Sequence, residues 1–316
     1  MKNQDKTTFH IGLCMAGAVS AGAYTAGVMD YLIEALEDWE KRKVSDPSNT
    51  PSHKVVIPVM GGASAGGMTS IIASNAIQRA ITPIRNINEG QDLAEKNKLY
   101  DSWVNLIADD MFPELLNCDD LKENEVKSLF NADFINEIAN KMLLPDEKLQ
   151  IVDRPYFAKN LKIFTTLTNL NGIPFHQKFN SEIENSSYHI SKHSDFAAFE
   201  LNTSQYNGNG WMPLNFENKE EREVAINAAM ATGAFPIGLR ARALKRPSKF
   251  VNELDWHNDI TNLEPIKGED CKTLNIDGGT INNEPFEKVR DVLDKYGVKN
   301  KNDKDYSTVK STVLMI

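Results

Sequence analysis

Cysteine is scarce in this chain: the 316 residues include only Cys14, Cys118 and Cys271, with no C-x-x-C pair. Such widely spaced thiols indicate neither a disulfide framework nor a zinc site, and they are typical of a reducing cytoplasm, where we expect the protein. Long apolar runs are also missing, because none approaches the roughly 20 residues of a membrane-spanning helix.

Positive charge is in the minority, since 35 Lys and Arg residues face 44 Asp and Glu residues, for a formal net charge of −9. This balance argues against nucleic acid as a partner and provides no overall attraction to an anionic membrane. The chain also lacks the Gly-Lys-Ser/Thr of a Walker loop, and the stretch from Gly17 to Gly22 does not match G-x-G-x-x-G. Nucleotide binding is therefore disfavoured, and we expect no cofactor.

The most informative segment is Met60-Gly61-Gly62-Ala63-Ser64-Ala65-Gly66-Gly67, which contains a G-x-S-x-G core. It lies between an apolar run at residues 55–59 and a helix-like run at residues 68–78, the context of a nucleophile elbow. Glycines at both flanks, here Gly62 and Gly66, avoid collisions with the neighbouring backbone. Ser64 is thus the candidate nucleophile, and an ordinary glycine-rich strand-to-helix turn is the alternative.

A second segment, Thr273-Leu274-Asn275-Ile276-Asp277-Gly278-Gly279, is a short strand pattern that ends in a carboxylate and a glycine turn. Asp277 is at the carboxyl end of this strand pattern, where α/β proteins commonly have their functional residues. Asp-Gly alone, however, is a common turn. A serine needs a base, usually a histidine, yet no histidine follows Asp277. Either a triad uses another pair of residues, or Asp277 acts on Ser64 directly.

A third segment, near the N-terminus, is predicted to form a strand at residues 9–14, a loop of small residues, and a helix. The loop is Met15-Ala16-Gly17-Ala18-Val19-Ser20-Ala21-Gly22-Ala23-Tyr24. Small residues let backbone N–H groups approach a ligand closely, which suits an anion or an oxyanion. A signal peptide is the alternative, because lysines precede this apolar stretch, but cleavage would remove the strand and the loop.

In this order the three segments resemble the patatin-like phospholipase family, and Ala231-Thr232-Gly233-Ala234-Phe235-Pro236 is similar to a segment that the family carries between serine and aspartate. The resemblance implies a three-layer α/β/α sandwich with a mainly parallel central sheet, and hydrolysis of lipid acyl esters by a Ser-Asp dyad. The implied site residues are the catalytic Ser64 and Asp277, the oxyanion-hole residues Gly17, Ala18 and Ala65, and the elbow residues Gly62 and Gly66. One departure is that Ala16-Gly17-Ala18-Val19 stands where the family has Asp-Gly-Gly-Gly.

For domain organisation, we expect one patatin-like domain over residues 1–316, with a helical insertion at about residues 81–150. Leu99 and Trp103 begin an amphipathic stripe that predicts a core-facing helix, with a lipid-facing lid as the alternative. Residues 161–178 are predicted to form a hairpin that turns at residues 169–172. The apolar strand pattern at residues 313–316 stops abruptly, as expected in a piece of a longer chain.

A basic stretch follows the Phe-Pro segment, because no Asp or Glu occurs from Val224 to Asn252. It contains Arg240, Arg242, Lys245, Arg246 and Lys249. A solvated basic loop is one interpretation, and contact of the two leading arginines with a lipid head group is the other.

A metal site is disfavoured. His189 and His193 have the spacing of a helical metal pair, but they lack the glutamate of H-E-x-x-H and occur among strand-forming residues.

The sequence therefore predicts a serine lipid acyl hydrolase, similar to phospholipase A or lysophospholipase, that acts on a lipid or acyl-ester substrate and contacts a membrane surface transiently. Two alternatives stay open. One is a Ser-His-Asp triad esterase, and the other is a catalytically idle patatin-like domain that binds lipid or a protein partner. Oligomeric state and head-group preference leave no signal in the sequence.

Overall fold

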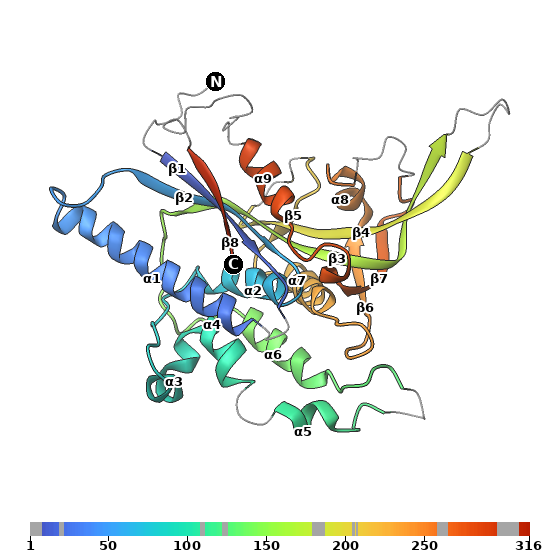
Figure 1. Cartoon of the computed structure of the whole chain (residues 1–316), viewed down its shortest axis with the longest axis horizontal. Coiled ribbons are helices and arrows are strands. Elements are labelled where there is room, and N and C mark those ends of the chain that lie inside the picture. The colour runs from blue at the N-terminus through green and yellow to red at the C-terminus, as the bar shows by residue number, and fades with distance from the viewer. Residues whose placement is uncertain are drawn as a thin grey trace.

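The computed structural model describes residues 8–18, 22–107, 111–121, 126–178, 187–203, 206, 208–257, 265–295 and 310–316. A mixed sheet of eight strands forms the centre of this part of the chain (Figure 1). The strands are β1 (Thr8–Met15), β2 (Lys54–Gly62), β3 (Phe157–Lys178), β4 (Ser187–Leu201), β5 (Met212–Leu214), β6 (Arg242–Pro247), β7 (Asp270–Asp277) and β8 (Ser311–Met315). Six of them follow the order β5-β4-β3-β2-β1-β8, while β7 pairs with β3 and β6 pairs with β7.

The parallel part of the sheet positions the ends of two strands side by side. β1 lies between β2 and β8 and is parallel to both, and β2 is parallel to β3. The carboxyl ends of β1 and β2 meet at one edge, since Met15 is opposite Gly62. The antiparallel pairs β3–β4, β3–β7 and β6–β7 extend the sheet away from this edge.

Helices cover both faces of the sheet. Helices α1 (Ala23–Ser45), α2 (Ser64–Ala76) and α7 (Lys219–Thr232) lie on one face, and α9 (Phe286–Lys295) lies on the other (Figure 1). Side chains alternate between the two cores, because Leu13 and Met15 belong to the α1/α2 core while Cys14 packs with Val289. The predicted three-layer α/β/α fold is confirmed.

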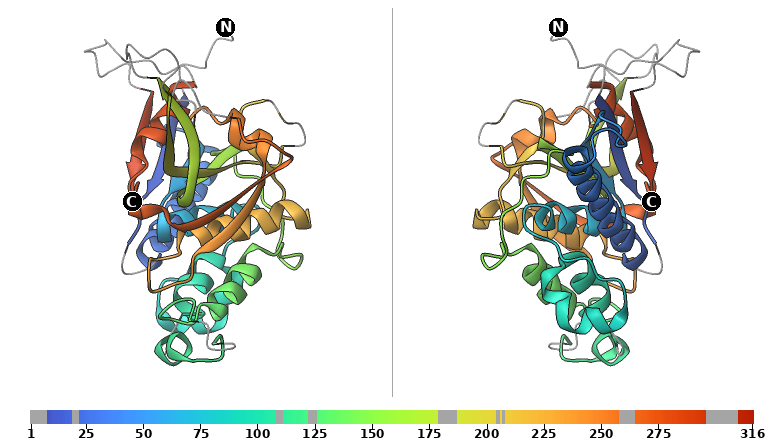
Figure 2. Two further views of the ribbon diagram at one scale, coloured as in Figure 1. Left: turned by 90° about the vertical axis from the view of Figure 1, so that its right-hand side faces the viewer. Right: turned by 90° about the vertical axis from the view of Figure 1, so that its left-hand side faces the viewer.

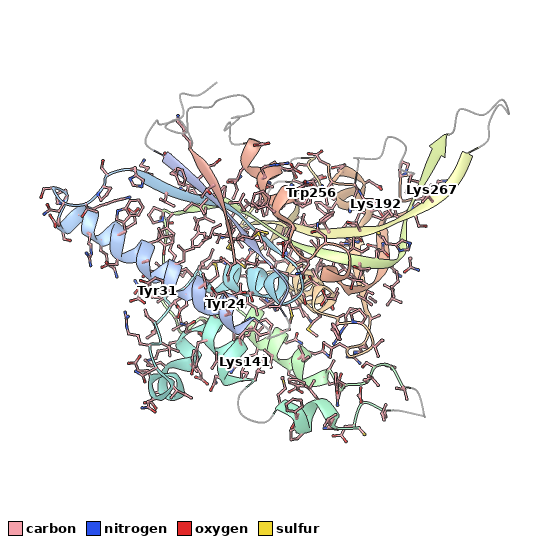
Figure 3. The ribbon with its side chains drawn as sticks, in the orientation of Figure 1. Tyr24, Tyr31, Lys141, Lys192, Trp256 and Lys267 are labelled. Carbon is pink, nitrogen blue, oxygen red and sulfur yellow. The ribbon has the colours of Figure 1, made fainter. Side chains whose placement is uncertain are left out.

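The α9 face is rich in aromatic side chains. Trp256 follows α8 (Ser248–Glu253) (Figure 3). Its ring centroid lies 4.7 Å from that of Phe164 and 5.1 Å from that of Phe196, two residues of the sheet. Edge-on arrangements of this kind add to the area that the rings bury.

Short helices fill the region below α1 and α2 (Figure 2). They are α3 (Ile87–Leu93), η1 (Ala94–Lys96), α4 (Lys98–Tyr100), η2 (Asp101–Asn105), α5 (Met111–Leu116) and α6 (Asp133–Leu143). Leu99 and Trp103 are buried in the main core, so the core-facing orientation is confirmed. Lys141 joins α6 to η2 through Asp101, at 3.1 Å (Figure 3). Each helix in the described ranges is too short or too polar to cross a bilayer.

The hairpin predicted at residues 161–178 is wrong, because β3 runs through the expected turn as one long strand. The side chain of Asn169 accepts hydrogen bonds from the N–H groups of Asn171 and Gly172, at 3.0 and 3.1 Å. Gly172 has a φ of 71°, and the pairing with β4 shifts between Thr168 and Ile173. The turn-forming residues therefore produce a β-bulge and not a reversal of the chain.

Candidate active site

Ser64 occupies a sharp turn between β2 and α2. Its φ is +50°, a conformation that a residue with a side chain adopts only under constraint. The constraint comes partly from α7, because the N–H of Ser64 donates to Thr232 Oγ1 at 3.0 Å. Strained backbone of this kind costs roughly 1–3 kcal/mol and tends to occur at functional sites.

The glycines around Ser64 permit backbone segments to approach one another closely. A Cβ at Gly66 would lie 2.3 Å from the carbonyl oxygen of Met15, and a Cβ at Gly62 would lie 2.6 Å from the same atom. Both distances are to backbone, which has no room to yield. The end of β1 therefore packs directly on the elbow, as the two glycines predict.

Gly17 brings the N-terminal loop to the nucleophile. A Cβ there would lie 3.0 Å from Ser64 Cβ and 2.2 Å from Asn283 Oδ1. The N–H of Gly17 donates to the Asn283 carbonyl oxygen at 3.2 Å, and Asn283 Nδ2 donates to the Gly17 carbonyl at 3.3 Å. The Gly17 N–H, one of the three expected oxyanion donors, is therefore already occupied.

The other two expected donors, the N–H groups of Ala18 and Ala65, have no acceptor among the described residues. Ala18 is exposed and lines the same cavity as Ser64. Ala65 lies in the first turn of α2, where N–H groups have no intrahelical acceptor. Within the described residues neither N–H donates a hydrogen bond. Val19, which belongs to the segment that departs from the family loop, lies outside the described residues.

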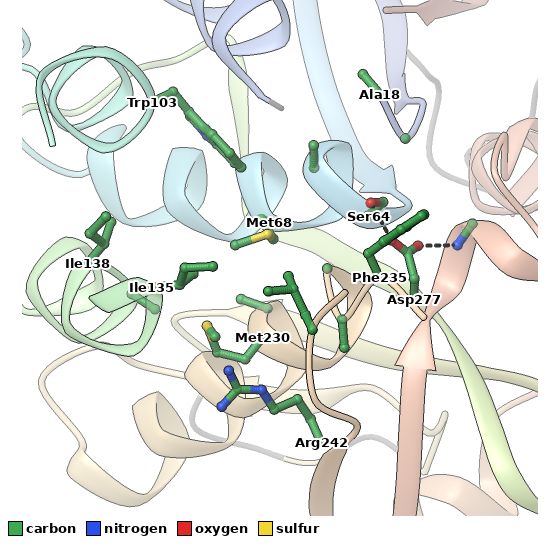
Figure 4. Close-up of a pocket in the computed structure, with 18 of the residues that line it drawn as sticks. Ala18, Ser64, Met68, Trp103, Ile135, Ile138, Met230, Phe235, Arg242 and Asp277 are labelled. Atoms are coloured by element: carbon green, nitrogen blue, oxygen red, sulfur yellow. Dashed lines mark hydrogen bonds between the residues drawn. The ribbon is translucent and has the colours of Figure 1, made fainter. Parts of the chain in front are cut away.

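Asp277 reaches Ser64 from the end of β7. The sheet register accounts for this, because Gly62 is opposite Thr165 of β3 while Asp277 is opposite Leu167. Ser64 Oγ donates to Asp277 Oδ2 at 2.6 Å, and the N–H of Gly279 donates to Oδ1 at 2.7 Å (Figure 4). Two residues that are 213 positions apart thus form one hydrogen-bonded pair.

The carboxyl group of Asp277 is almost fully buried, with 6% of the residue exposed. Burial raises its pKa, while the hydrogen bonds from Ser64 and Gly279 lower it, and the pKa ends above the ordinary aspartate value. A carboxylate with a raised pKa is a better proton acceptor than an exposed one.

A cavity of about 630 Å³ opens at this pair (Figure 4). Its walls come mainly from α2, α6 and α7 and are largely apolar; they include Met68, Ile72, Ile135, Ile138, Leu143, Met230 and Leu239. An apolar cavity with a few polar groups is the usual form of a small-molecule or lipid site. The α6 residues are missed by the sequence reasoning, although their i, i+3 spacing is a signal that could have identified them.

Histidine is absent from the described lining of the cavity. His257 is buried elsewhere, with Nδ1 2.9 Å from the Val251 carbonyl oxygen and Nε2 3.1 Å from Asp195 Oδ1. His193 Nδ1 lies 2.7 Å from the Asn169 carbonyl oxygen, and the side chain of its expected metal partner, His189, lies outside the described residues. Where side chains are described, no group of three His, Cys, Asp or Glu residues could hold a metal ion.

The basic stretch is not a solvated loop, because Arg242, Lys245 and Arg246 lie in β6 and Lys249 lies in α8. Alternation along the strand buries Arg246, which pairs with Asp195 at 2.6 Å, and exposes Lys245, which pairs with Asp270 at 2.8 Å. The two leading arginines also separate. Arg240 pairs with Asp133 at 2.9 Å, and Arg242 lines the cavity.

The family of the chain follows from comparison with known sequences. A sequence model described as Patatin-like phospholipase matches residues 13–290. The chain is also similar to Uncharacterized protein y4iI of Sinorhizobium fredii (strain NBRC 101917 / NGR234), with 32% identity over 332 aligned positions that cover 93% of this chain and 47% of that protein. The chain thus spans about half the length of this relative. With its α/β/α fold and the match over residues 13–290, the chain belongs to the patatin-like phospholipase family, whose members act on lipid esters.

Proposed function

We propose that this chain is a serine lipid acyl hydrolase in which Ser64 is the nucleophile and Asp277 is the base. The observation that carries the proposal is the 2.6 Å hydrogen bond from Ser64 Oγ to Asp277 Oδ2 at the wall of an apolar cavity. Family membership supports the reaction class, hydrolysis of lipid esters.

The reaction proceeds in two stages. In the first, Ser64 Oγ attacks the ester carbonyl carbon while its proton passes to Asp277 Oδ2, and the N–H groups of Ala18 and Ala65 stabilise the oxyanion. The tetrahedral intermediate collapses to an acyl-serine, and the departing alcohol takes the proton from Asp277. In the second, Asp277 accepts a proton from water, which attacks the acyl-serine; the acid leaves and the proton returns to Ser64.

The raised pKa of Asp277 supports its role as a base without histidine. A serine hydroxyl is a very weak acid, so the acceptor must be close, well oriented and more basic than an exposed carboxylate. The Gly279 N–H, 2.7 Å from Oδ1, fixes the carboxyl plane and leaves Oδ2 for the proton.

We also propose that the substrate is presented by a lipid surface. Several large apolar side chains near the cavity are exposed and form what we call the apolar rim: Phe112, Leu116, Leu129, Phe235 and Ile237. They are connected through backbone, because the Leu129 N–H donates to the Ile237 carbonyl oxygen at 2.9 Å and Asn131 N–H donates to the Leu115 carbonyl oxygen at 2.8 Å. Exposed apolar patches of this kind favour contact with lipid or protein.

A second candidate function is a domain that binds lipid without hydrolysing it. The observation in its favour is the Gly17 N–H, which is engaged by Asn283 and so is withdrawn from the expected set of oxyanion donors. Removing one such donor costs about 10²–10³ in rate in well-studied hydrolases. The triad esterase has less support, because the described cavity lining contains no histidine.

The decisive experiment is reaction of the purified chain with a fluorophosphonate probe, followed by mapping of the labelled residue. We expect a label on Ser64, and we expect Ser64→Ala to lower ester turnover at least about 10³-fold with an unchanged unfolding midpoint. Ser74→Ala is the matched control, because Ser74 lies in the same helix and its hydroxyl donates only to the Ile71 carbonyl oxygen. A folded, unlabelled and inactive protein would favour the binding domain.

A further inference from the structure

Arg242 is the one positively charged side chain in the described lining of the cavity. It lies at the start of β6, and the cavity wall beside it is apolar (Figure 4). The same view shows its guanidinium group well apart from Ser64 and Asp277. Arg242 therefore cannot stabilise charge at the reacting ester, and its position in the cavity needs another explanation.

The hydrogen bonds of Arg242 are incomplete. Nη1 donates to Asn136 Oδ1 of α6 at 2.7 Å. Nη2 is buried and finds no acceptor in the described part of the chain. A guanidinium group carries five N–H donors, and a buried donor left unpaired destabilises a protein.

Among the described residues, Arg242 likewise has no carboxylate hydrogen-bonded to it. Burial and the neighbouring charge of Arg240 lower the pKa of Arg242 to about 10, so the group is still positively charged at neutral pH. The carboxylate whose charge reaches it, Asp133, is hydrogen-bonded to Arg240 Nη2 at 2.9 Å. Asn136, its own hydrogen-bond partner, is neutral.

We propose that Arg242 forms an oxyanion-binding subsite, which holds a phosphate or carboxylate group of a substrate whose ester bond lies at Ser64. The proposal rests on the proposed hydrolase function for the identity of the ligand as substrate. An oxyanion in the cavity beside the guanidinium group would supply the missing negative charge. Guanidinium groups suit both anions, because their planar donors match carboxylate and phosphate oxygens.

The subsite makes a prediction about substrate choice. An ester that carries a second, anionic group should be preferred over its neutral counterpart, and Arg242 should be responsible for the difference. Arg240 takes no part, because its guanidinium is paired with Asp133 and is not among the lining residues.

The test compares matched esters by kcat/KM. Monoacylglycerol is compared with its phosphate, lysophosphatidic acid, and p-nitrophenyl butyrate is compared with the half ester p-nitrophenyl hydrogen glutarate. Arg242→Gln should lower kcat/KM at least about tenfold for the anionic member of one pair, the loss expected for a charged hydrogen bond, and less than about twofold for both neutral esters. The pair that responds identifies phosphate or carboxylate as the natural group.

Lys245→Gln is the matched control, because it removes one positive charge from the same strand at an exposed position that does not line the cavity. It should leave all four rates unchanged. Equal losses on neutral and anionic esters in Arg242→Gln, or no loss on either anionic ester, would overturn the subsite.

A direct binding measurement separates this inference from the hydrolase proposal. Calorimetric titration with decyl phosphate, decanoate and decanol requires no turnover, and it can use Arg242→Lys, which keeps the charge but loses the planar fork. We expect one of the two anions to bind the unaltered chain at least about tenfold more tightly than decanol, and Arg242→Lys to reduce that difference. Binding that depends on Arg242 in a protein without esterase activity would sustain the subsite and reject the hydrolase. Equal affinity for anions and decanol would reject the subsite.

Discussion

The carboxyl group of Asp277 combines two properties that oppose each other. Burial in the wall of the cavity raises its pKa, and two short hydrogen bonds orient it. A carboxyl group whose pKa is raised on folding destabilises the protein once the pH exceeds the pKa that the group has in the unfolded chain. The reason is that the group must then ionise in a poorly solvated site. The residue that serves as the base in our proposal is thus one that the fold keeps at the expense of stability.

Asp277→Asn tests both consequences. The amide keeps the shape and can donate to Ser64 Oγ, but it accepts no proton, so ester turnover should fall about 10³-fold or more while thermal stability at neutral pH stays equal or rises. In the unaltered enzyme, kcat/KM should increase with pH through a midpoint above the ordinary aspartate value. A pH–rate profile on a neutral soluble ester and a thermal unfolding curve provide the two measurements.

The control for this prediction is His257→Asn, which changes the described histidine that contacts a carboxylate. Full activity in Asp277→Asn, together with an inactive but folded His257→Asn, would point to a triad and against the dyad.

At this scale the sequence points to the hydrogen-bonded pair of Ser64 and Asp277 more readily than to the residues that support it. Ser64 and Asp277 belong to local patterns of glycine and strand residues, which is why motif reasoning selects them. Thr232 and Asn283, which hold Ser64 and Gly17, act across 168 and 266 positions of the chain. Such contacts depend on the whole fold, and neither residue type is unusual in its own segment.

Among the elements, β6 places neighbouring basic residues in different environments. Alternate side chains point to opposite faces, so Arg246 enters the core and Lys245 remains outside. Arg246 Nη1 and Nη2 donate to Asp195 Oδ1 and Oδ2 of β4, at 3.0 and 2.6 Å. Burial raises the pKa of Asp195, but the charge of Arg246 and the hydrogen bonds from Arg246 and His257 together outweigh burial and hold the pKa below its usual range.

We expect Asp195→Ala to destabilise the chain by about 3–5 kcal/mol, because it leaves the guanidinium of Arg246 buried without a counter-charge. The double change Asp195→Leu with Arg246→Met should recover most of that loss, since it removes both charges and keeps apolar volume. Urea unfolding midpoints measure the differences, and the exposed pair Lys245–Asp270 is the control. An Asp195→Ala midpoint no lower than that of Asp270→Asn would contradict this account.

Helices and strands are predicted correctly where the spacing of apolar residues distinguishes them. The prediction fails where turn-forming residues are compatible with more than one structure. The elbow strand, its helix and the core-facing Leu99 stripe follow from periodicity. Asn169 and Gly172 also satisfy the rules for a hairpin turn, yet the long pairing of β3 with β4 on both sides of them keeps the strand continuous. Local chemistry at residues 169–172 permits a turn or a bulge, and only the tertiary pairing selects between them.

At the scale of the whole molecule, the cavity and the apolar rim form one continuous feature, because Phe235 belongs to both. Ile237, beside it, is a β-branched residue with a φ of +70° and a side chain that is 78% exposed. Neither property favours the folded state in water, and both fit the contact between the apolar rim and lipid that we propose. The predicted single domain with an insertion at about residues 81–150 stays a prediction.

Leu129→Asn combined with Ile237→Asn should lower hydrolysis of ester in vesicles by roughly tenfold, through lost apolar contact with the bilayer. Neither residue lines the cavity, and Asn tolerates positive φ, so turnover of a monomeric soluble ester should be unchanged. Val44→Asn with Ile151→Asn is the control, since both side chains are exposed and outside the rim. Equal effects of the two double variants on vesicles would remove the rim from the mechanism.

The pairing of β8 with β1 has a consequence for the order in which the site is built. The Ala16 N–H donates to the Ile316 carbonyl oxygen at 2.8 Å, and the Ile316 N–H donates to the Cys14 carbonyl at 2.9 Å. The loop that approaches Ser64 is thus fastened by a residue synthesised 300 positions later than Ala16. Contacts of such long sequence separation cost loop-closure entropy before they stabilise the fold. A nascent chain that has not yet released residue 316 from the ribosome therefore lacks the partner that fastens the loop beside Ser64.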